Sequence, residues 1–96
     1  MGKMEDFSEV IKVVTELTDV SEQDILGKSR SQEIVDARWM ALYLMRQKGY
    51  TTAEIVEVSH FPERTINHAI HMFPDRISRF NCNLGNIYYQ ARQQFL

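Results

Sequence analysis

Apolar side chains recur every three or four residues along most of the chain, which is the period of an amphipathic α-helix. The first stripe predicts a helix over about residues 6–17 and consists of Phe7, Val10, Ile11, Val14 and Leu17. A broader stripe predicts the central helix of the core over about 32–48, which Gly49 is expected to end. The alternating pattern of a β-strand does not occur. The sequence therefore predicts an all-α fold.

Two short helices are predicted after the central one, separated by a turn of only a few residues. Thr51 and Glu54 form a capping-box pattern, which predicts the first of these helices over about 52–59. The second is predicted over about 62–73, with a proline at its start, where the missing N–H costs nothing. Two helices joined by so tight a turn form a helix-turn-helix, here over about residues 52–73.

The remaining helix boundaries follow from local signals. Ser21 predicts the start of a helix of one to two turns that ends at Gly27. Pro74 is expected to end the second helix of the helix-turn-helix, and a last helix is expected from about Leu84. We therefore predict a single domain over residues 1–96, a small bundle of five to six helices.

Charge is unevenly distributed along the chain, whose net charge is -2. Residues 1–24 carry two lysines and seven acidic residues, a net charge of -5, whereas residues 25–96 carry nine basic and six acidic residues, a net charge of +3. The mildly basic part could face DNA. The acidic N-terminal helix over 6–17 could be a solvated face or could hold a protein partner.

The polar positions on the second helix of the helix-turn-helix suit the bases of duplex DNA. If its apolar residues face the core, its outer side carries Arg64, Thr65, Asn67, His68 and His71. Arginine can bond guanine through two donors, and asparagine can read adenine in the same way. Any amphipathic surface helix also shows a polar face, so this pattern alone leaves both interpretations open.

Four stretches of the chain resemble one known family. Residues 24–31 are similar to its short helix and basic loop, and residues 38–44 (Arg-Trp-Met-Ala-Leu-Tyr-Leu) to the start of its long helix. The pair at 54–55 matches its Glu-Ile before the turn, and residues 65–69 (Thr-Ile-Asn-His-Ala) resemble its Thr-Val-x-His-Ala. Over about 13–95 the chain thus resembles the C-terminal DNA-binding domain of the bacterial replication initiator DnaA.

The resemblance implies that the chain binds duplex DNA, in replication or transcription regulation. Arg30 falls at the basic-loop arginine that enters the minor groove, and Ser31 falls beside it. Arg38 and Arg46 fall at positions near the phosphate backbone, and Thr65 at a threonine of the recognition helix. Phosphate contacts position such a domain, and base contacts specify the sequence. The candidate DNA-binding residues are Lys28, Arg30, Ser31, Arg38, Arg46, Arg64, Thr65, Asn67 and His68.

The chain also departs from the family's pattern. Where the family has a Gly-Gly-Arg-Asp-His-type run, residues 59–64 read Ser-His-Phe-Pro-Glu-Arg, without glycine and one residue shorter. Glu33 and Asp36 stand at positions that are often basic or neutral in the family. These differences and the negative net charge leave an alternative, a protein-interaction module that keeps the fold and has lost DNA binding.

Other kinds of site are not expected. The phosphate-binding pattern Gly-x-x-x-x-Gly-Lys-Ser/Thr does not occur, so we expect no bound nucleotide. His68 and His71 share a helix face and with His60 could suggest a metal, but zinc needs four ligands, usually Cys or His in close pairs, and Cys82 is distant in sequence. Cys82 is the only cysteine and lies in no catalytic motif. We therefore expect no catalytic site, no cofactor, no metal, no membrane contact and a reduced, cytoplasmic setting.

Overall fold

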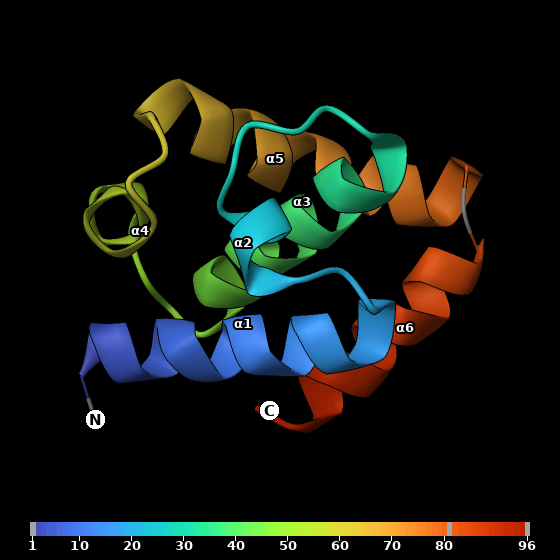
Figure 1. Cartoon of the computed structure of the whole chain (residues 1–96), viewed down its shortest axis with the longest axis horizontal. Helices are drawn as coiled ribbons and strands as arrows, with labels where there is room; N and C mark the ends of the chain where they lie inside the picture. Colours follow the sequence, from blue (N-terminus) through green and yellow to red (C-terminus); the bar gives the residue numbers. More distant parts are fainter. Residues whose placement is uncertain (1, 81, 96) are drawn as a thin grey trace.

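A computed structural model describes residues 2–80 and 82–95, apart from the side chains of Arg79, Phe80 and Cys82. The prediction of an all-α bundle of five to six helices is confirmed for these residues. The elements are α1 (Lys3–Thr18), α2 (Glu22–Ile25), α3 (Gln32–Gln47), α4 (Thr52–Ser59), α5 (Glu63–Asp75), a π-helical turn (Arg76–Phe80) and α6 (Cys82–Gln93) (Figure 1).

The central helix of the core is α3, as its broad apolar surface predicted. It contacts every other α-helix of the described chain, with α5 packed along one side and α1 along another (Figure 1). Its buried apolar side chains are Ala37, Met40, Ala41, Leu42, Leu44 and Met45. Because α5 packs directly on α3, the position of the predicted recognition helix is set by the core itself.

The acidic helix α1 is part of this core. Its stripe is buried as predicted, with Leu17 partly buried. The helix begins earlier than predicted, at Lys3, and ends at Thr18. Two polar contacts tie it to the helix-turn-helix region: Lys3 pairs with Glu57 of α4, and the Tyr50 hydroxyl donates to the Asp6 carboxylate.

The predicted start of the helix-turn-helix is confirmed. The backbone N–H of Glu54 donates to the Thr51 hydroxyl at 3.2 Å, and the Thr51 N–H donates to the Glu54 carboxylate at 2.9 Å. The Thr51 hydroxyl also donates to the Glu54 carboxylate at 3.1 Å, and the hydrogen bonds from the Thr51 N–H and then from this hydroxyl lower the pKa of Glu54. Gly49, which ends α3, has a φ of +101°, a conformation that side chains other than glycine rarely adopt.

Two boundaries near the C-terminus differ from the prediction. Pro74 does not end α5, which continues to Asp75 and passes directly into the π-helical turn. A proline has no N–H to donate to the carbonyl four residues earlier, and widened helical turns occur where that ladder is interrupted. The last helix begins at Cys82, two residues before the predicted Leu84.

Two edges of the bundle carry different parts of the chain. The segment that joins α2 to α3, together with α5, runs along one edge in Figure 1, and the start of α1 and the end of α6 lie toward the opposite edge. Over the described residues, no helix is both long and apolar enough to cross a membrane.

Candidate nucleic-acid interface

The turn between α4 and α5 is closed by backbone contacts of Ser59 and His60. The Ser59 hydroxyl donates to the Ile55 carbonyl at 2.7 Å and accepts from the Phe61 N–H at 3.2 Å. His60 has a φ of +63°, in the left-handed region, and its N–H donates to the Val56 carbonyl at 2.9 Å. Pro62 then precedes the first residue of α5 rather than occupying that position. The turn is therefore well defined although it contains no glycine.

The outer face of α5 carries the side chains that the sequence pattern placed there. Ile66, Ala69 and Phe73 are buried against the core. The candidate residues Arg64, Asn67 and His68 are exposed, and Thr65 is partly buried. An α-helix with such a face has the dimensions to enter the major groove of duplex DNA.

Two of these side chains are held by neighbours outside α5. The Thr52 hydroxyl at the start of α4 donates to the side-chain carbonyl of Asn67 at 3.0 Å. The imidazole of His68 meets the indole of Trp39 on α3, with ring centroids 5.4 Å apart. An amide oxygen has two lone pairs, so Asn67 can accept a second hydrogen bond while it keeps the one from Thr52.

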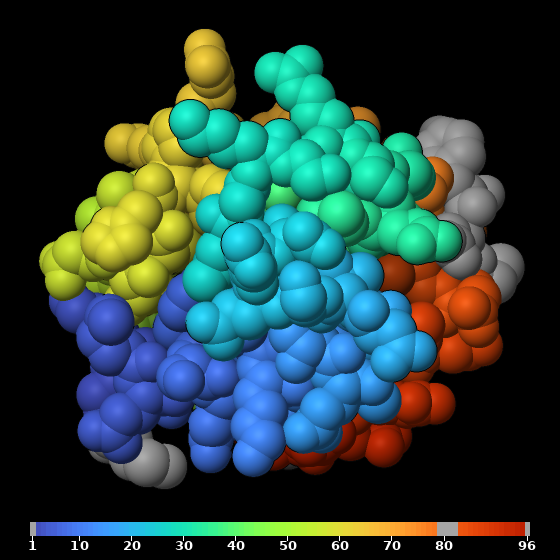
Figure 2. All heavy atoms as spheres, in the orientation of Figure 1, coloured from blue at the N-terminus to red at the C-terminus, as the bar shows by residue number. Residues whose placement is uncertain are grey.

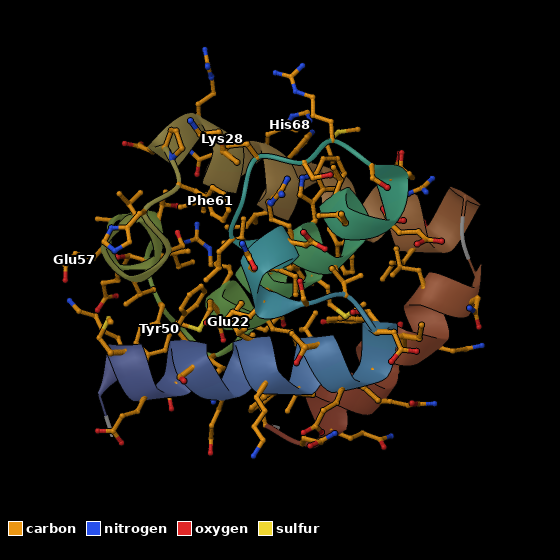
Figure 3. The ribbon with its side chains drawn as sticks, viewed as in Figure 1. Glu22, Lys28, Tyr50, Glu57, Phe61 and His68 are labelled. Atoms are coloured by element: carbon orange, nitrogen blue, oxygen red, sulfur yellow. The ribbon has the colours of Figure 1, made fainter. Side chains whose placement is uncertain are left out.

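The loop between α2 and α3 presents the second group of candidates. Lys28, Arg30 and Ser31 are all exposed, and the Ser31 N–H donates to the Ser29 hydroxyl at 3.3 Å. In Figure 2 the teal segment around this loop and the amber start of α5 form the same edge of the molecule. Figure 3 shows Lys28 and His68 along that edge. The fold thus brings the basic loop and the outer face of α5 to one side.

Arg38 differs from the expectation of a surface arginine that reaches a phosphate. Its side chain is buried, with only 8% of its surface exposed. The guanidinium points inward because it donates to four backbone carbonyl oxygens between residues 24 and 29, at 2.7–3.1 Å. Burial lowers the pKa of Arg38 from its ordinary value. We therefore correct the prediction that Arg38 contacts the phosphate backbone.

Arg46 lies at the far end of α3 from the basic loop. Arg46 stands 14 positions after Gln32 in the helix, which corresponds to about 21 Å along the axis. Its guanidinium is exposed and donates to the Tyr50 carbonyl at 3.3 Å, next to the cap of α4. The structure thus groups Arg46 with the start of the helix-turn-helix and not with Lys28 and Arg30.

An acidic residue near the start of α3 is neutralised by an arginine that the sequence pattern did not indicate. Asp36 accepts two hydrogen bonds from Arg76, at 3.0 and 3.2 Å, and a third from Gln32 at 2.9 Å. The hydrogen bond to Asp36 raises the pKa of Arg76. Because the Asp36 side chain is only 8% exposed, its carboxylate is not presented to solvent beside the loop. No sequence signal links two residues 40 positions apart.

The histidines near the predicted surface are not grouped with other described metal-ligating side chains. Among the side chains that the structure describes, no three of the types His, Cys, Asp or Glu are grouped so as to hold a metal ion. The side chain of Cys82 lies outside the described part of the chain.

One family model matches the chain. It is described as the bacterial DnaA protein helix-turn-helix, and it covers residues 7–71, from the first turns of α1 into α5. The match begins earlier than the resemblance over 13–95 and leaves the end of α5 and all of α6 outside it. No curated protein and no solved structure matches the chain. The chain therefore belongs to the bacterial DnaA helix-turn-helix family of DNA-binding domains.

Proposed function

We propose that this chain binds duplex DNA by placing the outer face of α5 in the major groove and the loop before α3 against the adjacent minor groove. The observation that carries the proposal is that the exposed loop residues and the exposed face of α5 form one edge of the molecule (Figures 2 and 3). Two adjacent grooves of a duplex can both be reached from one such edge.

The first residues of α5 make the base contacts in this arrangement. Residues near the N-terminus of a recognition helix ordinarily reach the bases, so Arg64, Thr65 and His68 face base edges. Arg64 is suited to guanine, and the Thr65 methyl to the methyl group of thymine. Asn67 lies further along the helix and is held by Thr52 at the start of α4.

In this arrangement the basic loop and Arg46 of α3 contact the DNA backbone. Arg30 enters or flanks the minor groove, where the negative potential attracts an arginine, and Lys28 contacts a phosphate beside it, with Ser31 as a neighbouring polar contact. Arg46, exposed near the end of α3 and bonded to the Tyr50 carbonyl, makes a further contact with the DNA backbone. These contacts fix the register of the domain, so that α5 reads sequence in a replication or transcription control region inside the cytoplasm.

The test is fluorescence anisotropy of a labelled duplex titrated with the protein at two salt concentrations. One duplex carries the site of the DnaA family and the other a random sequence. We expect binding that weakens steeply with salt, because each neutralised phosphate adds about 0.9 to the slope of log affinity against log salt. A preference for one duplex shows sequence reading, and the absence of binding at low salt overturns the proposal.

Charge-matched variants locate the interface. Arg64→Gln should weaken binding on the order of tenfold or more, the range of a bidentate arginine–guanine contact. Lys28→Gln should lower the salt slope by about one phosphate equivalent. Arg92→Gln on α6 and Lys12→Gln on α1 remove the same charges from exposed positions elsewhere and should leave affinity unchanged. Equal losses in all four variants would show a general charge effect and no defined interface.

The exposed acidic side of α1 favours a second candidate function. Glu5, Glu9 and Glu16 are exposed on a helix whose opposite side is fixed in the core. This surface suits a basic protein partner. Recovery of one stoichiometric partner after nuclease treatment, combined with the absence of DNA binding at low salt, would select the protein-interaction module over the DNA-binding domain.

A further inference from the structure

The guanidinium of Arg38 is surrounded by the backbone of the segment that leads into the basic loop. Nε donates to the Ile25 carbonyl at 2.7 Å, and Nη1 donates to the Ser29 carbonyl at 3.0 Å. Nη2 donates to the carbonyls of Asp24 and Gly27, both at 3.1 Å. Four of the five N–H donors of this side chain are thus used on one stretch of six residues.

These bonds add donors to the carbonyls at the end of α2, where the Asp24 carbonyl also accepts from the Gly27 N–H at 3.2 Å. The carbonyls at the end of a helix have no N–H donor in the next turn, and α2 is only four residues long. A cation at a helix C-terminus also interacts favourably with its partial negative charge. A side chain of α3 therefore holds the chain from Asp24 to Ser29 in place, together with the backbone hydrogen bonds at the end of α2.

The same guanidinium also touches the helix-turn-helix. The Phe61 ring lies 5.5 Å from the Arg38 Cζ, a cation–π distance. Phe61 is the residue after His60 in the turn between α4 and α5, and Figure 3 shows it between that turn and the loop. Arg38 therefore contacts both structures that the proposed function places on DNA.

We propose that Arg38 is a positioning residue for DNA binding: it holds the basic loop in the shape that presents Lys28 and Arg30, at a fixed position relative to the turn before α5. This proposal rests on the proposed function of DNA binding. It assigns Arg38 no contact with DNA, and the effect of Arg38 on affinity passes through the loop. A lysine keeps the charge but has a single side-chain nitrogen, so it cannot donate to four carbonyls arranged around a planar guanidinium group.

The test is the DNA affinity of Arg38→Lys, measured by anisotropy at low salt, alone and combined with Arg30→Gln or with Arg64→Gln. We expect Arg38→Lys to weaken binding on the order of tenfold. With Arg30→Gln the two losses of affinity should combine to less than their product, because the Arg30 contact that Arg38 positions is already lost and only the Lys28 contact of the loop remains to be disturbed. With Arg64→Gln on α5 they should multiply, because that contact is independent of the loop.

Amide hydrogen exchange provides the readout that a general loss of stability would not reproduce. In Arg38→Lys, the amides of residues 26–31 should exchange faster while those of α3 and α5 keep their wild-type rates. Phe61→Leu keeps an apolar side chain and removes the ring, so it should show a smaller increase in exchange at the same loop amides. This variant replaces Arg38→Lys in the test if Arg38→Lys does not fold.

Three outcomes overturn the proposal. Wild-type affinity of Arg38→Lys would mean that only the charge matters, as for a direct phosphate contact. Affinity losses that multiply equally with Arg30→Gln and with Arg64→Gln, together with faster amide exchange throughout the domain, would mean that Arg38 stabilises the fold without positioning the loop. The absence of DNA binding by the wild-type protein would overturn the proposed function and this inference with it, so the two failures are distinguishable.

Discussion

The indole of Trp39 stands edge-on to the imidazole of His68, with the ring planes 80° apart and the centroids separated by 5.4 Å. This contact joins the central helix α3 to the exposed face of α5. Trp39 is the only tryptophan of the chain. Its fluorescence therefore reports on the surroundings of one residue at the proposed interface, without any added label.

We predict that duplex DNA changes the fluorescence of Trp39 with the same midpoint as the anisotropy change of the labelled duplex. DNA bound to α5 covers His68 and alters the polarity around the neighbouring indole. His68→Ala should shift the emission of the free protein and reduce the DNA-induced change. Anisotropy that saturates while the Trp39 emission stays constant would show that DNA binds another face of the molecule.

The pair formed by Asp36 and Arg76 predicts a measurable stability effect. In Arg76→Ala the nearly buried Asp36 carboxylate keeps only the hydrogen bond from Gln32. We expect the free energy of unfolding to fall by about 1–3 kcal/mol, the cost of leaving such a group underpartnered. The melting temperature should fall by roughly 4–8 °C for each kcal/mol in a domain of this size.

The double variant Asp36→Asn with Arg76→Ala checks the reason for that loss. It removes the buried charge together with its partner, so it should be more stable than Arg76→Ala alone. A double variant that is less stable than Arg76→Ala would show that Arg76 stabilises the end of α5 through other contacts.

The raised pKa of Tyr50 leads us to predict a loss of stability in alkaline solution. The hydrogen bond to Asp6, followed by burial and the negative charge of Asp6, raises the pKa of Tyr50 from 10.0 to about 12. A raised pKa in the folded state adds stability that is fully present below pH 10 and is lost as the pH rises to about 12. Denaturant unfolding of wild type and Tyr50→Phe should show a stability difference that shrinks over this range.

Asp6→Asn is the companion variant for the alkaline measurement. Without the carboxylate, Tyr50 loses the largest cause of its raised pKa. The difference in the free energy of unfolding between Asp6→Asn and the double variant Asp6→Asn with Tyr50→Phe should therefore change little with pH. The other tyrosines are present in every variant compared, so their contribution to the pH dependence of stability cancels in the difference. A pH-dependent difference that persists without Asp6 would assign the effect to burial.

The left-handed conformation of His60 predicts a stabilising substitution. A side chain in this conformation costs about 1–2 kcal/mol, and glycine avoids the steric part of that cost. After allowance for the greater freedom of glycine in the unfolded chain, we expect His60→Gly to raise the free energy of unfolding by about 0.5–1 kcal/mol. Thermal unfolding followed by circular dichroism measures the change.

Two further variants control for the backbone explanation. Asp19→Gly acts on the same conformation at the end of α1, with a φ of +60°, and should also raise stability. Gly49→Ala introduces a side chain at a φ of +101° and should lower stability by about 1 kcal/mol or more. A loss of stability in His60→Gly alone would show that the imidazole itself stabilises the turn.

The helices could be predicted because the signals that define them are local. The capping box from Thr51 to Glu54 spans four residues, and the apolar stripe of α5 repeats at the helical period, so each is visible in a short window of sequence. Pro74 is the exception among the boundaries. Its usual effect is to end a helix, but here α5 extends through it into a widened turn.

The inner organisation of the candidate site could not be predicted, because it depends on contacts between distant positions. Arg38 was selected as a surface arginine since nothing in its own stretch of sequence shows that carbonyls 9–14 positions earlier surround it. The partner of Asp36 could not be predicted for the same reason, because Arg76 lies 40 positions later in the sequence. The outward direction of Arg64 followed from the apolar pattern of α5, whereas Lys28 and Arg30 were selected through the resemblance of their segment to the basic loop of the family.

The arrangement of the two chain ends has a practical consequence for surface-based assays. Because the start of α1 and the end of α6 lie toward the edge opposite α5 and the loop (Figure 1), the protein can be anchored to a sensor through either end. Both orientations leave Arg30 and Arg64 facing the solution. Immobilised molecules attached by one end or the other should therefore give the same duplex affinity, whereas anchoring through a residue introduced at position 67 should abolish it.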